Sequence, residues 1–269
     1  MTGDELDGRS IDRGLAIIIA TYNEIDNLPT LVEQLTSLLP EANILVIDDN
    51  SPDGTGQWCD QNKDLYPAMN CLHRTGKLGL GSATLEGFRW AIEQGHSFVA
   101  TMDADFSHDP ATLPALYETI SRDPSPELAV AIGSSYVDGG SIEGWPMFRR
   151  LASKAVNAFA RMWLGLSSRD NSGAFRVYRT DALKTTGLNS IHSKSYSYLE
   201  EILYRFKQAG FRTVEHPIVF KDRELGVTKT NWKLGVIVFW EIFLFRFFST
   251  KRSSTIASQE PTSRENKNE

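Results

Sequence analysis

The sequence predicts an α/β fold with a mostly parallel central sheet and helices on both faces. Two observations indicate this class. Short, continuous apolar runs end at polar residues, as in LAIIIA at 15–20 and NILVI at 43–47, and segments of helical periodicity lie between such runs. The length of 269 residues is enough for one large domain or two small ones. The net charge of -6 argues against a nucleic-acid partner, because non-specific binding requires clustered Lys and Arg.

The first unit of the sheet is expected between residues 15 and 47. Its two apolar runs predict buried parallel strands. Between them, NLPTLVEQLTSLLP places leucines and a valine at helical spacing, with Asn27 as the expected cap and Pro29 in the first turn. This stretch therefore predicts a strand–helix–strand unit.

The same alternation continues along the chain, more weakly after about Pro124. We expect a helix at 82–93 and a strand at 97–102, followed by a strand at 128–136 and a helix at 145–165. The later elements expected are a loop and strand over 167–179, a helix at 197–210 and a strand at 213–220.

The chain ends are expected to lie outside the folded domain. Residues 1–13 predict a flexible N-terminus without an apolar signal core, and residues 249–269 a polar, disordered tail. The apolar segment 233–248 is shorter than the roughly 20 residues that a membrane span needs. Core packing and a membrane-surface location, with Trp240 and Phe243 at the headgroup boundary, remain alternatives for it.

Polar clusters follow three of the expected strands: TYNE at 21–24, DDNSPDGTG at 48–56 and DADFSHD at 103–109. Ligand sites in such sheets lie beyond the carboxyl ends of the strands, so one edge would gather several carboxylates. These repel one another unless a cation lies among them, and oxygen ligands suit Mg²⁺ or Mn²⁺. The alternative is a solvated turn, with Asp109 capping a helix and His108 exposed to solvent.

A glycine-rich stretch, HRTGKLGLGSA at 73–83, leads into the helix expected at 82–93 and carries Arg74 and Lys77. Glycines before a helix N-terminus can hold an anion, but the spacing matches neither of the common phosphate-binding patterns. A flexible loop and a phosphate-contacting loop are therefore both open.

Several ordered motifs resemble one known family. IIIATYNEIDNLP, ILVIDDNSPDGTG, HRTGKLGLGSATLEGF and MDADFSHDP are similar to those of the polyprenyl-phosphate (dolichol-phosphate) mannosyltransferases of glycosyltransferase family 2. The likeness continues through GSSYVDGGSIEGWPMFRR, DNSGAFRVYR, SYSYLEEILYR and PIVFKDRELGVTK. It implies a glycosyltransferase A catalytic domain at 14–232, with GDP-mannose as donor, a polyprenyl phosphate lipid as acceptor, and Mg²⁺ or Mn²⁺ as cofactor.

The resemblance also implies roles for individual residues. It assigns Asp105 to the metal, with Ser107 completing its shell, and makes Asp105, Arg223 and Lys229 the catalytic residues. Arg223 and Lys229 match the family's DRxxGxSK pattern, whose basic residues hold phosphates. The nucleotide-sugar site would comprise Ala20, Tyr22, Glu24, Ile47, Asp49, Lys77, Asp103, Ala104, Asp105, Arg223 and Lys229.

Two residues depart from the family pattern. Ala20 replaces a proline, which reduces rigidity. Ser135 stands where the family has an arginine near the diphosphate, and serine cannot supply a charged, bidentate group. Either another base, Arg149, Arg150 or Arg176, compensates, or the donor or the activity differs.

The acceptor lipid implies a cytoplasmic protein associated peripherally with the cytoplasmic face of a membrane, and it leaves open a membrane-anchoring partner subunit. Cys59 and Cys71 show neither metal-ligand spacing nor a disulfide pattern, in keeping with a reducing compartment. The alternatives are a polyprenyl-phosphate glucosyltransferase using UDP-glucose, an aspartate-dependent phosphohydrolase, and an inactive nucleotide-sugar-binding protein.

Overall fold

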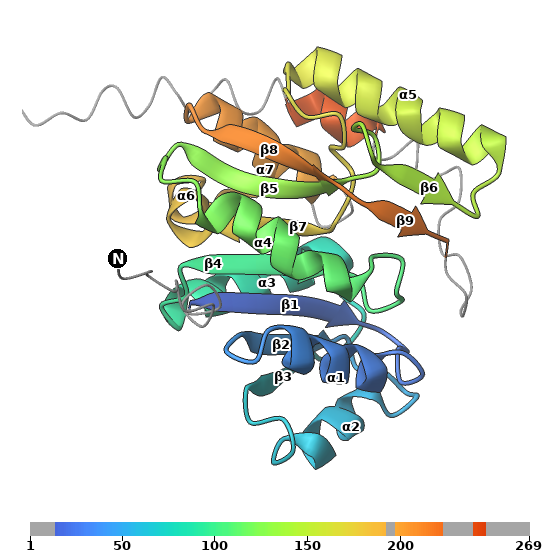
Figure 1. Ribbon diagram of the computed structural model, residues 1–269, viewed down its shortest axis with the longest axis vertical. Helices are drawn as coiled ribbons and strands as arrows, with labels where there is room; N and C mark the ends of the chain where they lie inside the picture. The colour runs from blue at the N-terminus through green and yellow to red at the C-terminus, as the bar shows by residue number, and fades with distance from the viewer. Residues whose placement is uncertain (1–13, 192–196, 223–238, 246–269) are drawn as a thin grey trace, which may run out of the picture.

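A seven-stranded, mostly parallel sheet forms the centre of the molecule (Figure 1). The computed structural model describes residues 14–191, 197–222 and 239–245. The strand order is β3-β2-β1-β4-β7-β5-β8, and only β7 runs antiparallel to its neighbours in this sheet. The strands are β1 (Leu15–Thr21), β2 (Asn43–Asp48), β3 (Met69–His73), β4 (Phe98–Met102), β5 (Leu128–Ser134), β7 (Arg176–Arg179) and β8 (Arg212–Pro217). The α/β fold class expected from the sequence is confirmed.

Two further strands, β6 (Ser141–Glu143) and β9 (Val219–Lys221), pair in parallel as a small second sheet. β9 follows β8 almost directly and extends past the edge of the main sheet (Figure 1). It also bridges to His108 in the loop after β4. The second sheet is therefore connected, through β9, to the acidic loop at 103–109.

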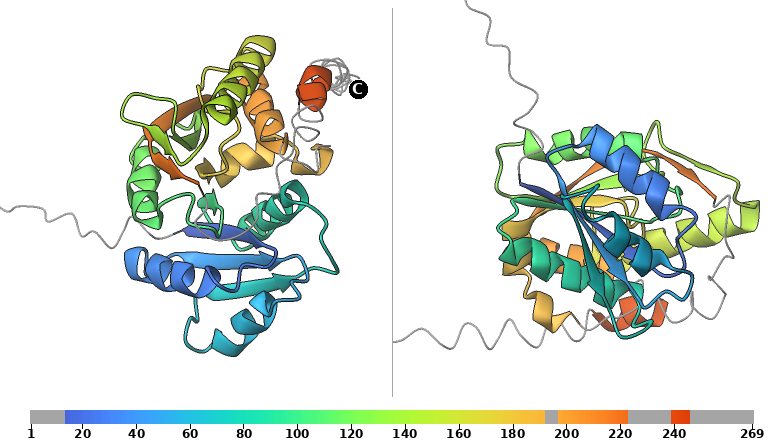
Figure 2. Two further views of the ribbon diagram at one scale, coloured as in Figure 1. Left: turned by 90° about the vertical axis from the view of Figure 1, so that its right-hand side faces the viewer. Right: turned by 90° about the horizontal axis from the view of Figure 1, so that it is seen from below.

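Helices cover both faces of the main sheet (Figure 2). The helices on one face are α1 (Leu28–Leu38), α2 (Thr55–Asn62) and α4 (Leu113–Ser121); those on the other are α3 (Leu80–Glu93), α5 (Met147–Leu164), α6 (Thr180–Thr185) and α7 (Tyr198–Gln208). Short 3-10 turns lie at Pro110–Thr112 and Leu188–Ser190, and residues 239–245 form a last helical segment.

Strand β1 is buried on both sides, which explains its unbroken apolar sequence. Leu15, Ile17 and Ile19 belong to the core under α1 and α4, whereas Ala16 and Ile18 belong to the core under α3 and α7. Each large apolar side chain buried in this way contributes about 1.5–3 kcal/mol. A strand packed on two faces must be apolar throughout, so this pattern is typical of a central parallel strand.

The expected elements are present with ends within a few residues of those predicted, except that the strand expected at 213–220 divides into β8 of the main sheet and β9 of the second sheet. The sequence analysis assigned no element to α2, β3, β6, α4 or α6. β3 lies at the edge of the sheet and buries only Met69 fully, and α2 is largely polar, so neither shows an apolar pattern. Asn27 is the N-cap residue of α1, as expected, but its side chain makes no capping hydrogen bond and its Nδ2 instead donates to Glu24 Oε2 at 3.1 Å.

The apolar segment expected at 233–248 is described only at 239–245. There Ile242 is fully buried, while Phe239 and Trp240 are 44% and 59% exposed, so this helical segment combines core packing with an apolar surface. Among the residues that the structure describes, no helix is long and apolar enough to cross a bilayer. The expected flexible N-terminus and polar tail lie outside the described residues.

Gly87 allows α3 to approach the sheet closely, which leads to a test of this packing. A Cβ at this position would lie 2.6 Å from Ile18 Cγ2 and 3.1 Å from Ile47 Cδ1. We expect Gly87→Ala to lower the free energy of unfolding by about 1–2 kcal/mol, despite the better helix propensity of alanine. Urea denaturation measures the change. Gly76→Ala is the control, since no atom lies within 4 Å of its added Cβ, and equal effects of the two variants would contradict this packing.

Candidate active site

Three loops begin side by side at the carboxyl edge of the sheet. The strand register places Thr21 of β1 opposite Asp48 of β2, and Ile19 of β1 opposite Met102 of β4. Each loop contains one non-glycine residue with a left-handed backbone: Asn23 at φ 60°, Asn50 at φ 59° and Phe106 at φ 57°. Asparagine tolerates this conformation well, whereas a bulky phenylalanine is strained in it. Such strain occurs preferentially at functional loops, so the loop carrying Phe106 is the most unusual of the three.

Asp48 holds two of these loops together. Its carboxylate accepts hydrogen bonds from Thr21 Oγ1 at 3.2 Å and from the Ser51 amide at 2.9 Å, and also from the Ser51 hydroxyl. Ser51 Oγ in turn accepts from the Asn23 amide at 2.9 Å. Asp48 is 2% exposed, so its role is to fix the loops rather than to meet a ligand.

Asp49 anchors the glycine-rich stretch. Its carboxylate lies 2.6 Å from Arg74 Nη1 and accepts from the Leu78 amide at 3.1 Å and the Gly79 amide at 3.4 Å. The Asp49 and Arg74 side chains are 9% and 5% exposed. A buried charge pair with these added hydrogen bonds determines the path of the chain from 74 to 79. The stretch is thus tied to the edge of the sheet at Asp49.

This anchoring brings Lys77 and Tyr22 together. Lys77 Nζ lies 4.3 Å from the centroid of the Tyr22 ring, within the range of a cation–π interaction. Glu24 lies two residues further on, and its amide donates to Thr55 Oγ1 at 3.0 Å. Tyr22, Glu24, Asp49 and Lys77 therefore share one side of the edge, as the nucleotide-site hypothesis requires.

The side chains of Ile47 and Ala104, unlike those of Tyr22 and Lys77, are buried and do not face the edge of the sheet. Ile47 is fully buried in the core beneath α3, and Ala104 is 3% exposed. Ala20 is half-buried at the end of β1. A ligand at this edge would meet the main chain of Ile47 and Ala104 rather than their side chains.

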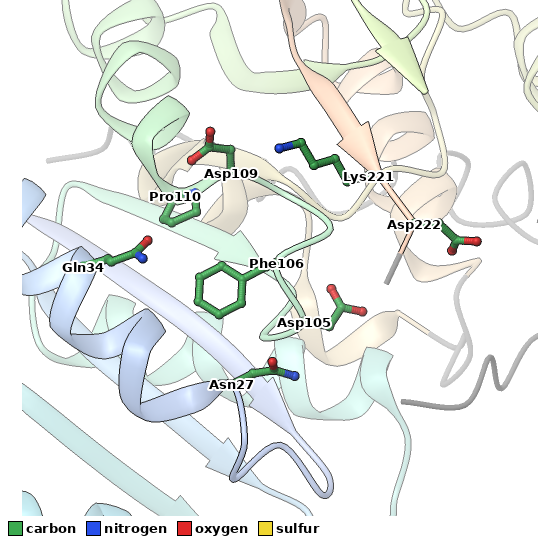
Figure 3. Close-up of a pocket in the computed structure, with 8 residues that line it drawn as sticks. All are labelled: Asn27, Gln34, Asp105, Phe106, Asp109, Pro110, Lys221 and Asp222. Carbon is green, nitrogen blue, oxygen red and sulfur yellow. The ribbon is translucent and has the colours of Figure 1, made fainter. Parts of the chain in front are cut away.

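Asp105 lies beside a cavity of about 340 Å³ (Figure 3). The side chain of Asp103 is partly open to solvent. Asp105 is 7% exposed, and its Oδ1 accepts from the Ser107 amide at 3.0 Å. The carbonyl of Ser107 accepts from the Lys221 amide of β9 at 3.1 Å. The residues lining the cavity are Asn27, Gln34, Asp105, Phe106, Asp109, Pro110, Lys221 and Asp222. β9 therefore fixes the backbone of the acidic loop through the hydrogen bond between Lys221 and Ser107.

The oxygen atoms of this loop suit a hard divalent cation. Within the described ranges, no group of three or more His, Cys, Asp or Glu is arranged around a metal position. Mg²⁺ and Mn²⁺ are bound through one or two carboxylates, with waters and substrate phosphates as the other ligands. Asp105, with Asp103 next to it, fits that kind of site and would not by itself form a closed structural metal site.

His108 was expected to be exposed, and this expectation is wrong. It is 3% exposed, because the acidic loop turns back beneath β9. Its ring stacks on Phe175 at 5.1 Å between centroids and meets the edge of Phe220 at 5.4 Å. Burial lowers the pKa of His108 to about 4, despite the opposing effects of Asp105 and Asp170. The imidazole is neutral at neutral pH and adds no positive charge beside the carboxylates.

Asp109 caps the turn that follows the acidic loop, as expected, and its Oδ1 accepts a hydrogen bond from the Ala111 amide at 2.9 Å.

Ser135 faces a buried carboxylate that the sequence analysis did not single out. Asp170 Oδ2 accepts from the Ser135 amide at 3.3 Å and from its hydroxyl at 3.4 Å, and Oδ1 accepts from the Gly173 amide at 3.0 Å. Burial raises the pKa of Asp170. Asp170 precedes an antiparallel strand, so the rule that ligands gather at parallel strand ends does not point to it.

Arg176 cannot compensate for the missing arginine at position 135. It is fully buried, and its guanidinium donates to the carbonyls of Gly173, Leu199 and Asn171 at 2.7, 3.1 and 2.6 Å. This residue braces the loop before β7. Of the three candidate bases, Arg149 and Arg150 remain.

Arg149 and Arg150 lie at the start of α5, close to the end of β9. Arg149 Nη1 donates to Asp222 at 3.1 Å, and its guanidinium lies 4.0 Å over the Trp145 ring. Arg150 Nε donates to the Trp145 carbonyl at 3.0 Å. Both side chains are half-buried rather than fully solvated. Arg223, which follows Asp222, and Lys229 lie outside the described residues.

Glu200 of α7 is a buried carboxyl that the sequence did not reveal. It is 1% exposed, and its Oε2 has no hydrogen-bond partner. Burial raises its pKa to about 8; the nearby charges include Arg176, Asp170 and Glu241. Its neighbour Glu201 instead pairs with Arg205 at 2.7 Å. Glu200 is therefore largely protonated at neutral pH.

The fold and the acidic strand-end loops together define a glycosyltransferase of the A-fold class. The sequence profile described as Glycosyl transferase family 2 matches residues 16–187, and the chain belongs to this family.

Characterised relatives are similar over most of the chain. The undecaprenyl-phosphate mannosyltransferase of Micrococcus luteus is 42% identical over 214 residues, which cover 80% of this chain and 86% of the relative. The polyprenol monophosphomannose synthase of Mycolicibacterium smegmatis is 42% identical over 216 residues, covering 80% of each chain. These similarities confirm the resemblance seen in the sequence motifs.

Solved structures share the fold at low sequence identity. Glucosyl-3-phosphoglycerate synthase from Mycobacterium tuberculosis, in complex with Mn²⁺, UDP and glucosyl-3-phosphoglycerate, aligns with a TM-score of 0.61 at 15% identity over 91% of this chain and 82% of that one. A mannosyltransferase from Pyrobaculum calidifontis, in complex with GDP-Man and Mn²⁺, aligns with a TM-score of 0.57 at 15% identity over 89% of this chain and 64% of that one. At such identity the comparison concerns the fold alone.

The buried Glu200 predicts a pH dependence of stability. Its pKa lies near 4.5 in an unfolded chain and about 8 in the fold, so the folded state keeps a proton that the unfolded state releases. The contribution of Glu200 to stability is then greatest below about pH 4.5 and falls by up to about 1.4 kcal/mol per pH unit between these two values. We expect Glu200→Gln to flatten this dependence of stability on pH, so that the variant is more stable than wild type at about pH 8.5. Denaturant unfolding across this range measures it. Glu93→Gln, at an exposed position, should keep the wild-type slope, and an unchanged slope in Glu200→Gln would refute the assignment.

Proposed function

We propose that this glycosyltransferase transfers mannose from GDP-mannose to a polyprenyl phosphate, with inversion at the anomeric carbon and with Mg²⁺ or Mn²⁺ as cofactor. The observation that carries the proposal is the set of acidic loops at adjacent strand ends, in a chain that is 42% identical over 80% of its length to enzymes named for mannose transfer to polyprenyl phosphates. The reaction joins two anionic substrates at one edge of a sheet. The main requirement of the site is therefore to stabilise the negative charge of both substrates.

The nucleotide side of the site is proposed at β1, β2 and the glycine-rich stretch. Tyr22, Glu24 and Asp49 border it, and Lys77 above the Tyr22 ring can turn toward a phosphate without leaving this edge. Asp49, already held by Arg74, offers a carboxylate edge of fixed orientation. Fixed groups of this kind orient a ligand with little loss of conformational entropy on binding.

Asp105 and Asp103 are proposed to hold the divalent cation, with Ser107 as a neighbouring oxygen donor. The cation, when bound, neutralises the charge that builds on the leaving diphosphate. The protein's part is to keep Asp105 in place, through the Ser107 amide and the attachment of Ser107 to β9. His108 stays neutral beneath this loop and so does not compete with the cation for the carboxylates.

The acceptor phosphate is proposed to approach from the side of β9. A phosphate oxygen attacks the anomeric carbon, and the bond to the diphosphate breaks on the opposite face. Because this nucleophile is already anionic near neutral pH, no strong general base is required. Arg223 and Lys229 would hold the acceptor phosphate and stabilise its charge, and the Arg149–Asp222 pair lies where the chain enters their segment.

The substrates also indicate where the enzyme works. A polyprenyl phosphate stays in a membrane, so the catalytic edge must reach the membrane surface. We propose peripheral association with the cytoplasmic face, by this chain alone or with a membrane-anchoring partner subunit.

The role of Asp105 is tested by Asp105→Asn. We expect turnover in the presence of Mn²⁺ or Mg²⁺ to fall at least about 100-fold, because the amide is a weaker metal ligand and the leaving charge is no longer offset. Mannosyl transfer from radiolabelled GDP-mannose measures this, together with Mn²⁺ binding by electron paramagnetic resonance.

Asp181→Asn is the matched control, since Asp181 is 90% exposed and pairs with Lys184 on the surface. It should keep wild-type turnover, and both variants should keep the wild-type melting temperature. Turnover near the wild-type level in Asp105→Asn would remove this residue from the proposed role.

Donor choice separates the proposal from its nearest alternative. With a polyprenyl phosphate acceptor, we expect the value of kcat/KM to be at least about 100-fold higher for GDP-mannose than for UDP-glucose, since buried polar contacts to a base discriminate strongly. A donor panel with Mn²⁺ measures these ratios. Preference for UDP-glucose would overturn the donor assignment, and metal-enhanced GDP-mannose binding without any product would indicate an inactive binding protein.

A further inference from the structure

The helix α5 packs one side on the sheet and carries exposed apolar side chains on its other side. Met147, Phe148, Leu151 and Met162 of α5 are 72%, 74%, 60% and 74% exposed. With 3.6 residues per turn these side chains lie along one side of the helix, with exposed alanines between them, while Ala160 and Leu164 on the opposite side are buried. We call this stripe the α5 surface. A soluble domain does not normally leave such a group of large apolar side chains uncovered.

Basic side chains border the α5 surface along its whole length. Arg150, Lys154 and Arg161 follow at helical spacing on one border, and Lys154 and Arg161 are exposed. The 18 residues of α5 include four basic residues and no acidic one, although the whole chain has a net charge of -6. A concentration of positive charge beside exposed apolar groups is typical of helices that lie on anionic membranes.

The neighbouring helical segment at 239–245 extends this surface. Phe159 of α5 stacks on Phe239 at 4.0 Å between centroids, and Trp163 stacks on Phe243 at 4.9 Å while its Nε1 donates to the Phe243 carbonyl at 3.1 Å. The two helices lie together at one end of the molecule (Figure 2). Of the ten large apolar side chains exposed in the described ranges, six belong to these two helices: Met147, Phe148, Leu151, Met162, Phe239 and Trp240.

We propose that the α5 surface, with Phe239 and Trp240, docks onto a lipid bilayer that carries anionic headgroups. The apolar stripe would enter the boundary between headgroups and acyl chains, and Lys154 and Arg161 would face the lipid phosphates. A second copy of the chain is a poorer occupant, since a symmetric contact would bring two sets of basic side chains together. The choice of a membrane rests in part on the proposed function, which requires a lipid acceptor.

The position of α5 supports this occupant. The helix begins beside the catalytic edge, where Arg149 pairs with Asp222 at 3.1 Å and Asp222 borders the cavity next to Asp105. A bilayer on the α5 surface would therefore present the phosphate of an embedded lipid near the level of this edge. The long polyprenyl chain could remain in the membrane during transfer.

The test measures binding of the full chain to vesicles without any nucleotide sugar or polyprenyl phosphate. Vesicles of phosphatidylglycerol mixed with phosphatidylcholine are compared with pure phosphatidylcholine by co-sedimentation. We expect wild type to prefer the anionic vesicles, and Phe148→Ser/Leu151→Ser/Met162→Ser to lower the partition coefficient at least about tenfold. Lys154→Glu/Arg161→Glu should lower binding to anionic vesicles by about tenfold or more and abolish the preference for them.

Matched controls lie away from this surface. Leu65→Ser removes an apolar side chain that is 67% exposed beyond α2, and Lys63→Glu reverses an exposed charge in the same region; both should bind like wild type. Equal binding by wild type and the apolar triple variant would overturn the proposal, as would failure of wild type to bind either kind of vesicle. A wild-type dimer in analytical ultracentrifugation that the triple variant dissociates would also overturn it, in favour of a self-association surface.

An activity assay separates this proposal from the proposed function. With a short-chain, water-soluble prenyl phosphate, the α5 variants should transfer mannose like wild type, whereas with a long-chain acceptor in vesicles they should lose at least about tenfold in kcat/KM. Absence of transfer with both acceptors in wild type would refute the proposed function and leave the vesicle-binding result standing. Equal losses with both acceptors would place α5 in the catalytic site instead of on the membrane.

Discussion

The position of β1 between β2 and β4 is the constraint on which the site depends. Parallel pairing on both sides of β1 aligns the carboxyl ends of β1, β2 and β4 to within a residue or two. The loops that follow these strands therefore lie at the same edge of the sheet. The pairing is itself stabilised by side chains buried on both faces of β1. Core packing and catalytic geometry are thus set by the same strand.

The carboxylates at that edge of the sheet differ in their roles. Asp48 and Asp49 are held by hydrogen bonds and by Arg74, and they shape the loops around them. This internal compensation reduces the repulsion that several carboxylates would otherwise exert on one another. Asp103 and Asp105 belong to a different loop, whose backbone is held by β9 and strained at Phe106. Asp48 thus holds its loops in place, Asp49 both anchors the glycine-rich stretch and is proposed to border the nucleotide, and Asp103 and Asp105 are the proposed cation ligands.

The sequence reveals most of the parallel half of the fold, because buried central strands have continuous apolar runs and their helices have clear periodicity. It does not reveal β3 or α2, which are polar elements at the edge of the sheet. Strand-end motifs and family resemblance predict a nucleotide side of the site, and this stays a prediction. They do not show that His108 is buried, since this depends on a bridge to Phe220, more than a hundred residues later. Nor do they single out Asp170 and Glu200, which are buried through tertiary packing and have no local pattern.

The attachment of the acidic loop to β9 has a consequence for the order of assembly. Strands β1, β2 and β4 can pair as soon as the first half of the chain is available, but Ser107 and His108 receive their backbone partners only from residues 220 and 221. During synthesis, the first half of the sheet can therefore form before the backbone of the acidic loop at 103–109 is held by β9. A chain that stops before β9 would therefore have the parallel scaffold but not the fixed acidic loop on which the proposed cation site depends.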